Sequence, residues 1–257
     1  MATRVETGAA AARSDDRFFF VMAIVMALVL VAGFSVQLAA GRSSFHAPLL
    51  VHVHAFMFFG WTFFYVLQNG LIASGSVSLH RRLGWLGLFW ASAMVAVGIA
   101  VTVVVVRRGA APFFFPPLRF LLMNGLSVIM FGGLLAVAIL LRRDSGWHRR
   151  LIYCGMALLT GPGFGRLLPM PFLIPWADWG IFAAIMIFPL AGVIADLRRT
   201  GAVHPAWWAG IAVMTCVQFL IGIVANSPAG LALYGLVTAG SPGAAVAPLA
   251  YPPFPPL

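Results

Sequence analysis

Three of the six histidines lie close together, just before and inside one long apolar stretch. Neutral imidazole nitrogens are the commonest protein ligands of metal ions and also bind haem iron. His52 and His54 are two positions apart, about 200° around a regular helix, so their rings cannot reach one atom from such a helix. They could converge with His46 if residues 46–53, which include a proline, are irregular. The sequence therefore offers His46, His52 and His54 as candidate metal ligands near one membrane face.

His54 also begins a polar stripe along the helix expected there. Steps of three and four residues lead from it to Phe58, Trp61, Tyr65 and Gln68, which carry most of the polar atoms of the segment. Residues at this spacing share one helix face, so His54 is predicted to face the interior of a bundle. The alternative, a histidine that is merely solvated at the membrane surface, applies more strongly to its two neighbours.

A second pair of histidines belongs to an internal repeat. His80 lies in the run Leu-His-Arg-Arg-Leu at 79–83, and His148 lies in the run Trp-His-Arg-Arg-Leu at 147–151. Each run begins the return helix of a predicted hairpin, so the two imidazoles could supply two axial ligands to haem iron. In the alternative, each His-Arg-Arg run faces lipid phosphates and begins a helix that binds no cofactor.

Polar residues near the opposite helix ends could hold an anionic group. Arg119 and Arg166 could bind carboxylates or phosphates, such as haem propionates or a lipid head group. Asn124, which the repeat aligns with His54, lies about a turn and a half beyond Arg119. Asp178 is the only acid in this layer, and we expect it to pair with Arg166. The simpler alternative is a structural ion pair that joins two helices.

Membrane-spanning helices must position these residues. The chain is 62% hydrophobic and 9% charged, whereas soluble proteins are about 45–50% apolar and about 25% charged. Because one span needs roughly 20 residues, we predict an all-α polytopic bundle of about seven transmembrane helices. The expected spans are residues 18–40, 50–74, 84–106, 119–141, 151–173, 178–196 and 206–227.

The basic residues, all sixteen of them arginines, indicate the orientation of the bundle. They gather in the loops of one side, which the positive-inside rule assigns to the cytoplasm. We therefore expect a bacterial inner-membrane protein with a cytoplasmic N terminus and a periplasmic C terminus. Residues 1–17 form the cytoplasmic segment, 18–227 the transmembrane bundle, and 228–257 an Ala/Gly/Pro-rich tail with a short interfacial piece and an extended end. Membrane lipids and other respiratory membrane subunits are the expected partners, and nucleic acid is excluded.

Several kinds of catalytic motif are missing from the sequence. It has no glycine-rich phosphate loop, no Cys-x-x-Cys, no His-Glu-x-x-His and no Gly-x-Ser-x-Gly. We also expect no pair of carboxylates within the membrane, which argues against a proton-coupled transporter and against carboxylate-held magnesium. Cys154 and Cys216 are expected to pack as small apolar residues and not to form a disulfide.

The run from His54 through Gln68 to Leu-His-Arg-Arg-Leu-Gly at 79–84 resembles a family pattern, His…Gln…His-Arg-x-Leu-Gly, found in uncharacterised bacterial multi-pass His-rich membrane proteins. Some of these are similar to haem–copper oxidase assembly factors of the YozB/CtaM type and, more distantly, to transmembrane cytochromes b. The resemblance covers about residues 50–170. It implies a helical bundle whose histidines, here His54, His80 and His148, bind haem b or a transition metal such as Cu, Fe or Zn. The chain departs from a two-haem cytochrome because it lacks clear histidine pairs at matched depths on facing helices.

The leading hypothesis is a membrane protein that binds haem or a metal through His54, with His52 or His46, and has a redox role or a role in the maturation of a respiratory enzyme. Arg119 and Arg166 would support an anionic group there. The first alternative is a zinc-dependent membrane hydrolase, in which histidine-bound zinc activates water. The second is a non-catalytic subunit or channel with structural histidines. The residues leave open whether the protein is an enzyme.

Overall fold

The computed structural model describes residues 2–42 and 46–254, with side chains from residue 15 onward. These ranges are helical and contain no strand, which confirms the predicted all-α class. The helices are α1 (Ala2–Ala39), α2 (Leu49–Ala73), α3 (Val77–Arg107), α4 (Pro117–Leu140), α5 (Ser145–Leu159), α6 (Gly161–Leu167), α7 (Ala177–Thr200), α8 (Pro205–Ala225) and α9 (Pro228–Thr238), with short 3₁₀ turns at Met170–Leu173 and Pro242–Ala245.

Six helices in the described ranges are long and apolar enough to cross a bilayer: α1 from Asp15 onward, α2, α3, α4, α7 and α8. They correspond to six of the seven predicted spans. The predicted span 151–173 is instead divided into α5, α6 and a 3₁₀ turn. The break falls at Gly161-Pro162-Gly163, because a proline has no N–H for the helix and its ring clashes with the preceding turn. The chain is a membrane protein whose outer surface contacts lipid.

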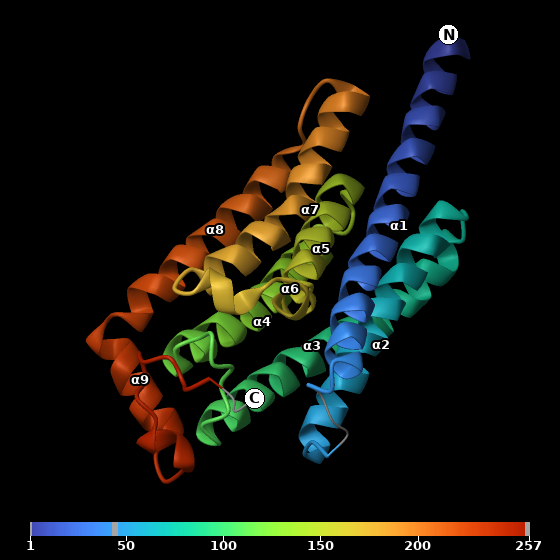
Figure 1. The fold of residues 1–257 in the computed structure, drawn as a ribbon. Coiled ribbons are helices and arrows are strands. Elements are labelled where there is room, and N and C mark those ends of the chain that lie inside the picture. Colours follow the sequence, from blue (N-terminus) through green and yellow to red (C-terminus); the bar gives the residue numbers. More distant parts are fainter. Residues whose placement is uncertain (1, 43–45, 255–257) are drawn as a thin grey trace.

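Figure 1 shows that the helices run between two ends of the bundle. The N terminus and the α7–α8 loop lie at the upper end, which also holds the start of α5. We call this the arginine-rich end, and it carries Arg81, Arg82, Arg142, Arg143, Arg149, Arg150, Arg198 and Arg199. The C-terminal helix α9 lies at the opposite, far end. Since α5 begins at the arginine-rich end and α6 leads to the far-end start of α7, α5 and α6 together connect the two ends of the bundle.

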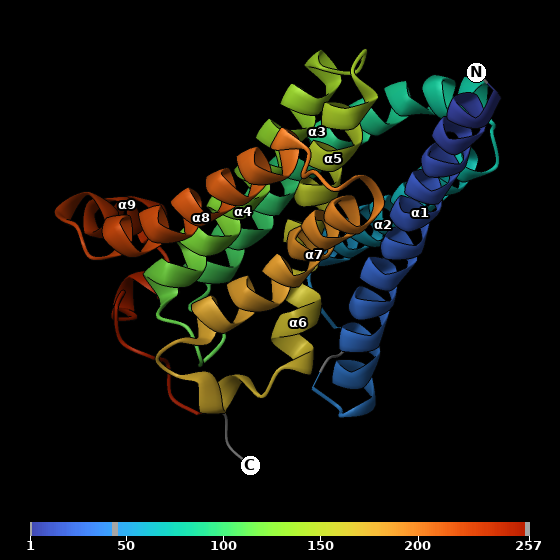
Figure 2. The ribbon, with the colours of Figure 1, turned by 90° about the horizontal axis from the view of Figure 1, so that it is seen from above.

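The repeated hairpins are antiparallel helix pairs that pack together, α2 with α3 and α4 with α5. Helix α8 packs on α4 and α5, while the long helix α1 lies along α2 and crosses α6. The view in Figure 2 shows α1 at one side of the bundle and α8 with α9 at the other. The crossing of α1 and α6 is close, because a Cβ on Gly33 would lie 2.5 Å from the carbonyl oxygen of Gly163. Small residues allow such an approach between membrane helices.

The C-terminal tail differs from the prediction of an extended end. Ser227 caps α9 by accepting a hydrogen bond from the Gly230 N–H. Beyond α9 the chain returns to the bundle, where the Leu118 N–H donates to the Pro248 carbonyl (3.0 Å) and the Tyr251 hydroxyl donates to the Pro175 carbonyl (3.4 Å). The segment 228–254 therefore covers the far end of α4 and the start of α7.

Asp144 fixes the start of α5. Its carboxylate accepts hydrogen bonds from the N–H groups of Gly146 (2.9 Å) and Trp147 (3.2 Å), which have no partner within the helix. We expect Asp144→Ala to lower the free energy of unfolding by about 1 kcal/mol, the usual cost of losing such a cap. Thermal unfolding in detergent would measure the loss. Asp144→Asn should retain most of the stability, since asparagine caps equally well; equal losses in both variants would contradict this role.

Candidate functional site

The structure brings the two repeat histidines together at the arginine-rich end. The ring centroids of His80 and His148 are 6.4 Å apart, and the ring planes are nearly perpendicular, at 84°. Each is the fourth residue of its helix, in α3 from Val77 and in α5 from Ser145. The repeat thus places one histidine pair at a matched depth on neighbouring elements. The expectation that the chain lacks such a pair is wrong.

Each of the two rings is also held by a backbone carbonyl. His148 Nδ1 lies 2.8 Å from the carbonyl oxygen of Ala138, near the end of α4. The backbone carbonyl of Gln68 in α2 acts on the His80 ring, whose Nδ1 is buried with no hydrogen-bond partner among the described residues. An imidazole that donates one N–H to a carbonyl presents its other nitrogen as an acceptor or metal ligand. A carbonyl that accepts from one ring nitrogen in this way orients the other nitrogen, as it does for many metal-binding histidines.

Helix α2, which contains Gln68, also buries polar side chains that have no hydrogen-bond partner among the described residues. The side chain of Gln68 is buried, and neither its Oε1 nor its Nε2 has a hydrogen-bond partner among the described residues. The indole Nε1 of Trp61 is likewise buried without a hydrogen-bond partner among the described residues. Trp61, Tyr65 and Gln68 form the buried face of α2, as the polar stripe predicted. Because buried polar groups are almost always satisfied in folded proteins, these atoms indicate a missing ligand or water.

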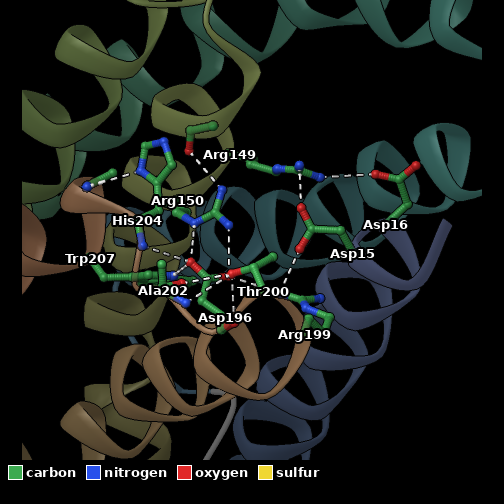
Figure 3. A network of polar contacts seen from close by, with 12 residues as sticks. Asp15, Asp16, Arg149, Arg150, Asp196, Arg199, Thr200, Ala202, His204 and Trp207 are labelled. Carbon is green, nitrogen blue, oxygen red and sulfur yellow. Dashed lines mark hydrogen bonds and ion pairs between the residues drawn. The ribbon is translucent and has the colours of Figure 1, made fainter. Parts of the chain in front are cut away.

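A buried ion pair begins two residues after His148, at the arginine-rich end of the bundle (Figure 3). Arg150 donates from Nε and Nη2 to the two carboxylate oxygens of Asp196, at 3.1 and 2.8 Å. The indole N–H of Trp207 donates to the same carboxylate at 2.9 Å, and the backbone N–H of His204 donates at 3.2 Å. Arg150 and Asp196 are 6% and 2% exposed. This bidentate pair joins α5 to α7 and to the start of α8.

The network continues to the N-terminal helix. Arg149 pairs with Asp15 and, at 3.1 Å, with Asp16, and Arg199 pairs with Asp15 (2.6 Å) and Asp196 (3.0 Å). With the pair described above, the connected group contains three arginines and three aspartates among the residues whose side chains the structure describes. We call it the Arg–Asp network. It ties α1, α5 and α7 together, and Figure 3 shows Asp15 and Asp16 on one side of Arg149.

The loop histidine His204 acts at the edge of this network. Its Nδ1 accepts a hydrogen bond from the Ala206 N–H at 3.2 Å and so caps α8. Burial, and next the positive charge of Arg150, lower the pKa of His204 below its ordinary value. The ring is therefore neutral at pH 7, which is the form that can accept this bond.

Sequence reasoning missed the Arg–Asp network. The sequence did not show that Asp15 and Asp196, both buried, would share Arg199 at the ends of their helices. A signal was present in the sequence, since these acids stand at the ends of two predicted spans while Arg149 and Arg150 follow the repeat histidine. The spacing alone did not show which helices would be neighbours.

The far-end histidines do not form the three-ligand cluster. Helix α2 begins at Leu49 and is regular through His52 and His54, so the irregular segment needed for convergence is missing. His46 and His52 are exposed, and His54 is half-buried with its ring 4.1 Å from that of Phe58. Over the described residues, no three His, Cys, Asp or Glu side chains are grouped so that they could hold a metal ion.

The far-end arginines have separate partners. Asp178 pairs with Arg119 at 3.4 Å and accepts from Gln218 Nε2 at 3.3 Å, so the expected pairing of Asp178 with Arg166 is wrong. The physical reason is that α7 starts beside α4 and α8. The side-chain amide of Asn124 donates to the Phe120 carbonyl one turn earlier in α4. Arg166 lies instead against α1.

The two cysteines are both free, as predicted, with Cys154 buried and Cys216 exposed. Comparisons of the chain with models of protein families, with characterised proteins and with solved structures found no match. The resemblance to His-rich membrane proteins and oxidase assembly factors therefore stays a prediction from short motifs. The residues themselves define a helical membrane protein with a facing pair of imidazoles at its arginine-rich end.

Proposed function

We propose that this protein binds haem iron or a transition-metal ion between His80 and His148 and takes part in electron transfer or in the maturation of a respiratory metalloenzyme. The observation that carries the proposal is the facing pair of rings, each held by a helix carbonyl. By the positive-inside rule this site would lie at the cytoplasmic side of a bacterial inner membrane.

The separation of the two rings supports a shared metal. A bond from a metal to an imidazole nitrogen is about 2 Å, and the nitrogen is ~1 Å from its ring centroid. Two imidazoles on opposite sides of one metal atom are then separated by about 6 Å between centroids, close to the observed 6.4 Å. Nearly perpendicular ring planes allow both rings to point at the same atom without clashing.

The surrounding residues suit either form of the cofactor. Two imidazoles make a full axial set for haem iron, and imidazole also suits Cu, Fe and Zn ions. Gln68 has a buried amide without a partner that could add a ligand or a hydrogen bond. Arg81 and Arg82 follow His80 on the exposed surface, where guanidinium groups could hold carboxylates such as those of haem.

Metal analysis and visible spectra of the purified protein would test the proposal. We expect one haem or one metal ion per chain after loading with iron protoporphyrin or with copper or zinc salts. A haem would show a Soret band that shifts with dithionite. His80→Gln and His148→Gln should each weaken binding by about tenfold or more, because each removes a direct ligand, and even second-shell changes cost 10–100-fold. His46→Gln, at an exposed histidine of the far end, is the matched control.

Two results would contradict the proposal. One is a wild-type protein that takes up neither haem nor a metal ion in stoichiometric amount. The other is full uptake by both ligand variants. One bound zinc with no colour would retain the histidine site but favour the hydrolase over a redox role.

A further inference from the structure

Arg166, at the far end, has no acidic partner. Every acid whose side chain the structure describes is engaged elsewhere. Asp15, Asp16, Asp178 and Asp196 pair with other arginines, and Asp144 caps α5. A charge in apolar surroundings is costly unless it is paired, and such residues mark functional sites in membrane proteins.

The guanidinium of Arg166 is nevertheless held in a defined position. Nη1 donates to the Pro162 carbonyl at 2.8 Å, and the guanidinium carbon lies 3.9 Å from the centroid of the Phe34 ring. Its Nε is buried and has no hydrogen-bond partner among the described residues. The side chain as a whole is only half-buried. A planar donor group is thus fixed over an aromatic ring with N–H groups left for a ligand.

Helices α1, α2 and α6 come together near this guanidinium. Phe34 of α1 contacts Phe59 of α2, with ring centroids 5.0 Å apart. His54 is slightly more than one turn earlier in α2, and the charge of Arg166 acts on its ring. The close crossing of α1 and α6 at Gly33 and Gly163 holds the two sides together. A guanidinium is therefore fixed over Phe34, and its charge reaches the half-buried imidazole of His54.

We propose that Arg166 and His54 bind the phosphate oxyanion of an anionic lipid head group. The guanidinium fork matches two phosphate oxygens, and an imidazole N–H can donate to a third. The neighbouring residues Leu167 and Val53 are exposed and apolar, at 42% and 39%, as contact with acyl chains requires. This site lies at the far end and is independent of the proposed metal site.

Lipid binding to the full-length protein in a neutral detergent tests this proposal. Native mass spectrometry and thermal unfolding would be followed during titration with phosphatidylglycerol, with diacylglycerol as a lipid that lacks phosphate, and with inorganic phosphate. We expect phosphatidylglycerol to bind and to raise the unfolding temperature. Arg166→Gln should weaken this binding about tenfold or more, the effect of losing hydrogen bonds to a charged group. Arg108→Gln, at an exposed arginine of the same end, should bind like the wild type.

Each result of this experiment either supports or overturns the proposed lipid site. A response to inorganic phosphate that depends on Arg166 supports the oxyanion site and identifies free phosphate as a ligand. Wild-type protein that binds phosphatidylglycerol no better than diacylglycerol overturns the proposal, and this comparison needs no variant. Arg166→Gln and His54→Leu variants that both bind phosphatidylglycerol as tightly as the wild type also overturn it. If Arg166→Gln does not fold, His54→Leu and the wild-type comparison decide.

Discussion

Asp196→Asn is expected to lower the free energy of unfolding by about 3–5 kcal/mol, the usual cost of removing one partner from a buried ion pair. The carboxylate of Asp196 accepts hydrogen bonds from Arg150, Arg199 and Trp207 and is 2% exposed. An asparagine has nearly the same shape, but it is neutral and has only one acceptor oxygen. Arg150 would then be a buried cation without its counter-ion. Unfolding followed by tryptophan fluorescence in detergent measures the loss.

Two further variants show whether charge is the cause. Asp144→Asn makes the same chemical change at an exposed acid and should leave stability nearly unchanged, since asparagine is also a good cap. The double variant Arg150→Met with Asp196→Leu should be more stable than Asp196→Asn, because apolar residues of similar volume can replace a buried pair at little cost. If Asp196→Asn unfolds at the wild-type temperature, the network does not stabilise the bundle in this way.

Gly163→Ala is expected to destabilise the protein by about 1–3 kcal/mol, the usual range for overpacking a well-packed site. A Cβ at this position would lie 2.9 Å from the Val29 carbonyl oxygen and 3.2 Å from the Leu30 Cα. Both contacts are with backbone of α1, which cannot rotate away as a flexible side chain would. The helices α1 and α6 must then separate, and we expect a lower unfolding temperature in the same fluorescence assay.

Gly125→Ala is the matched control, because a Cβ at Gly125 in α4 would meet nothing within 4 Å. Alanine is the better helix former, so this change should be neutral or stabilising by up to about 1 kcal/mol. A Gly163→Ala protein as stable as Gly125→Ala would show that the crossing is looser than the structure has it.

The local features of this fold could be read from the sequence. Long apolar runs predicted seven spans, six of which are long helices, and the polar stripe predicted the buried face of α2 that carries Trp61, Tyr65 and Gln68. The repeat placed His80 and His148 at equivalent positions. These predictions succeed because they depend on the period of one helix or on the likeness of two hairpins.

The sequence did not show which acid pairs with which arginine. Asp178 pairs with Arg119, although the sequence predicted a pair with Arg166. Arg149 and Asp16 are 133 residues apart in the chain. Such pairs depend on which helices become neighbours, and apolar surfaces that all resemble one another carry little information about that choice.

The Arg–Asp network also constrains the order of biogenesis. Helix α1 is synthesised first, yet the arginines that neutralise Asp15 and Asp16 belong to α5 and α7. Until the ribosome has passed Arg149, the first helix carries two acids whose counter-ions in the network do not yet exist. The nascent chain must therefore keep α1 in a provisional position, with its acids still hydrated at the membrane surface. It can reach its final place in the bundle only after most of the other helices have been inserted.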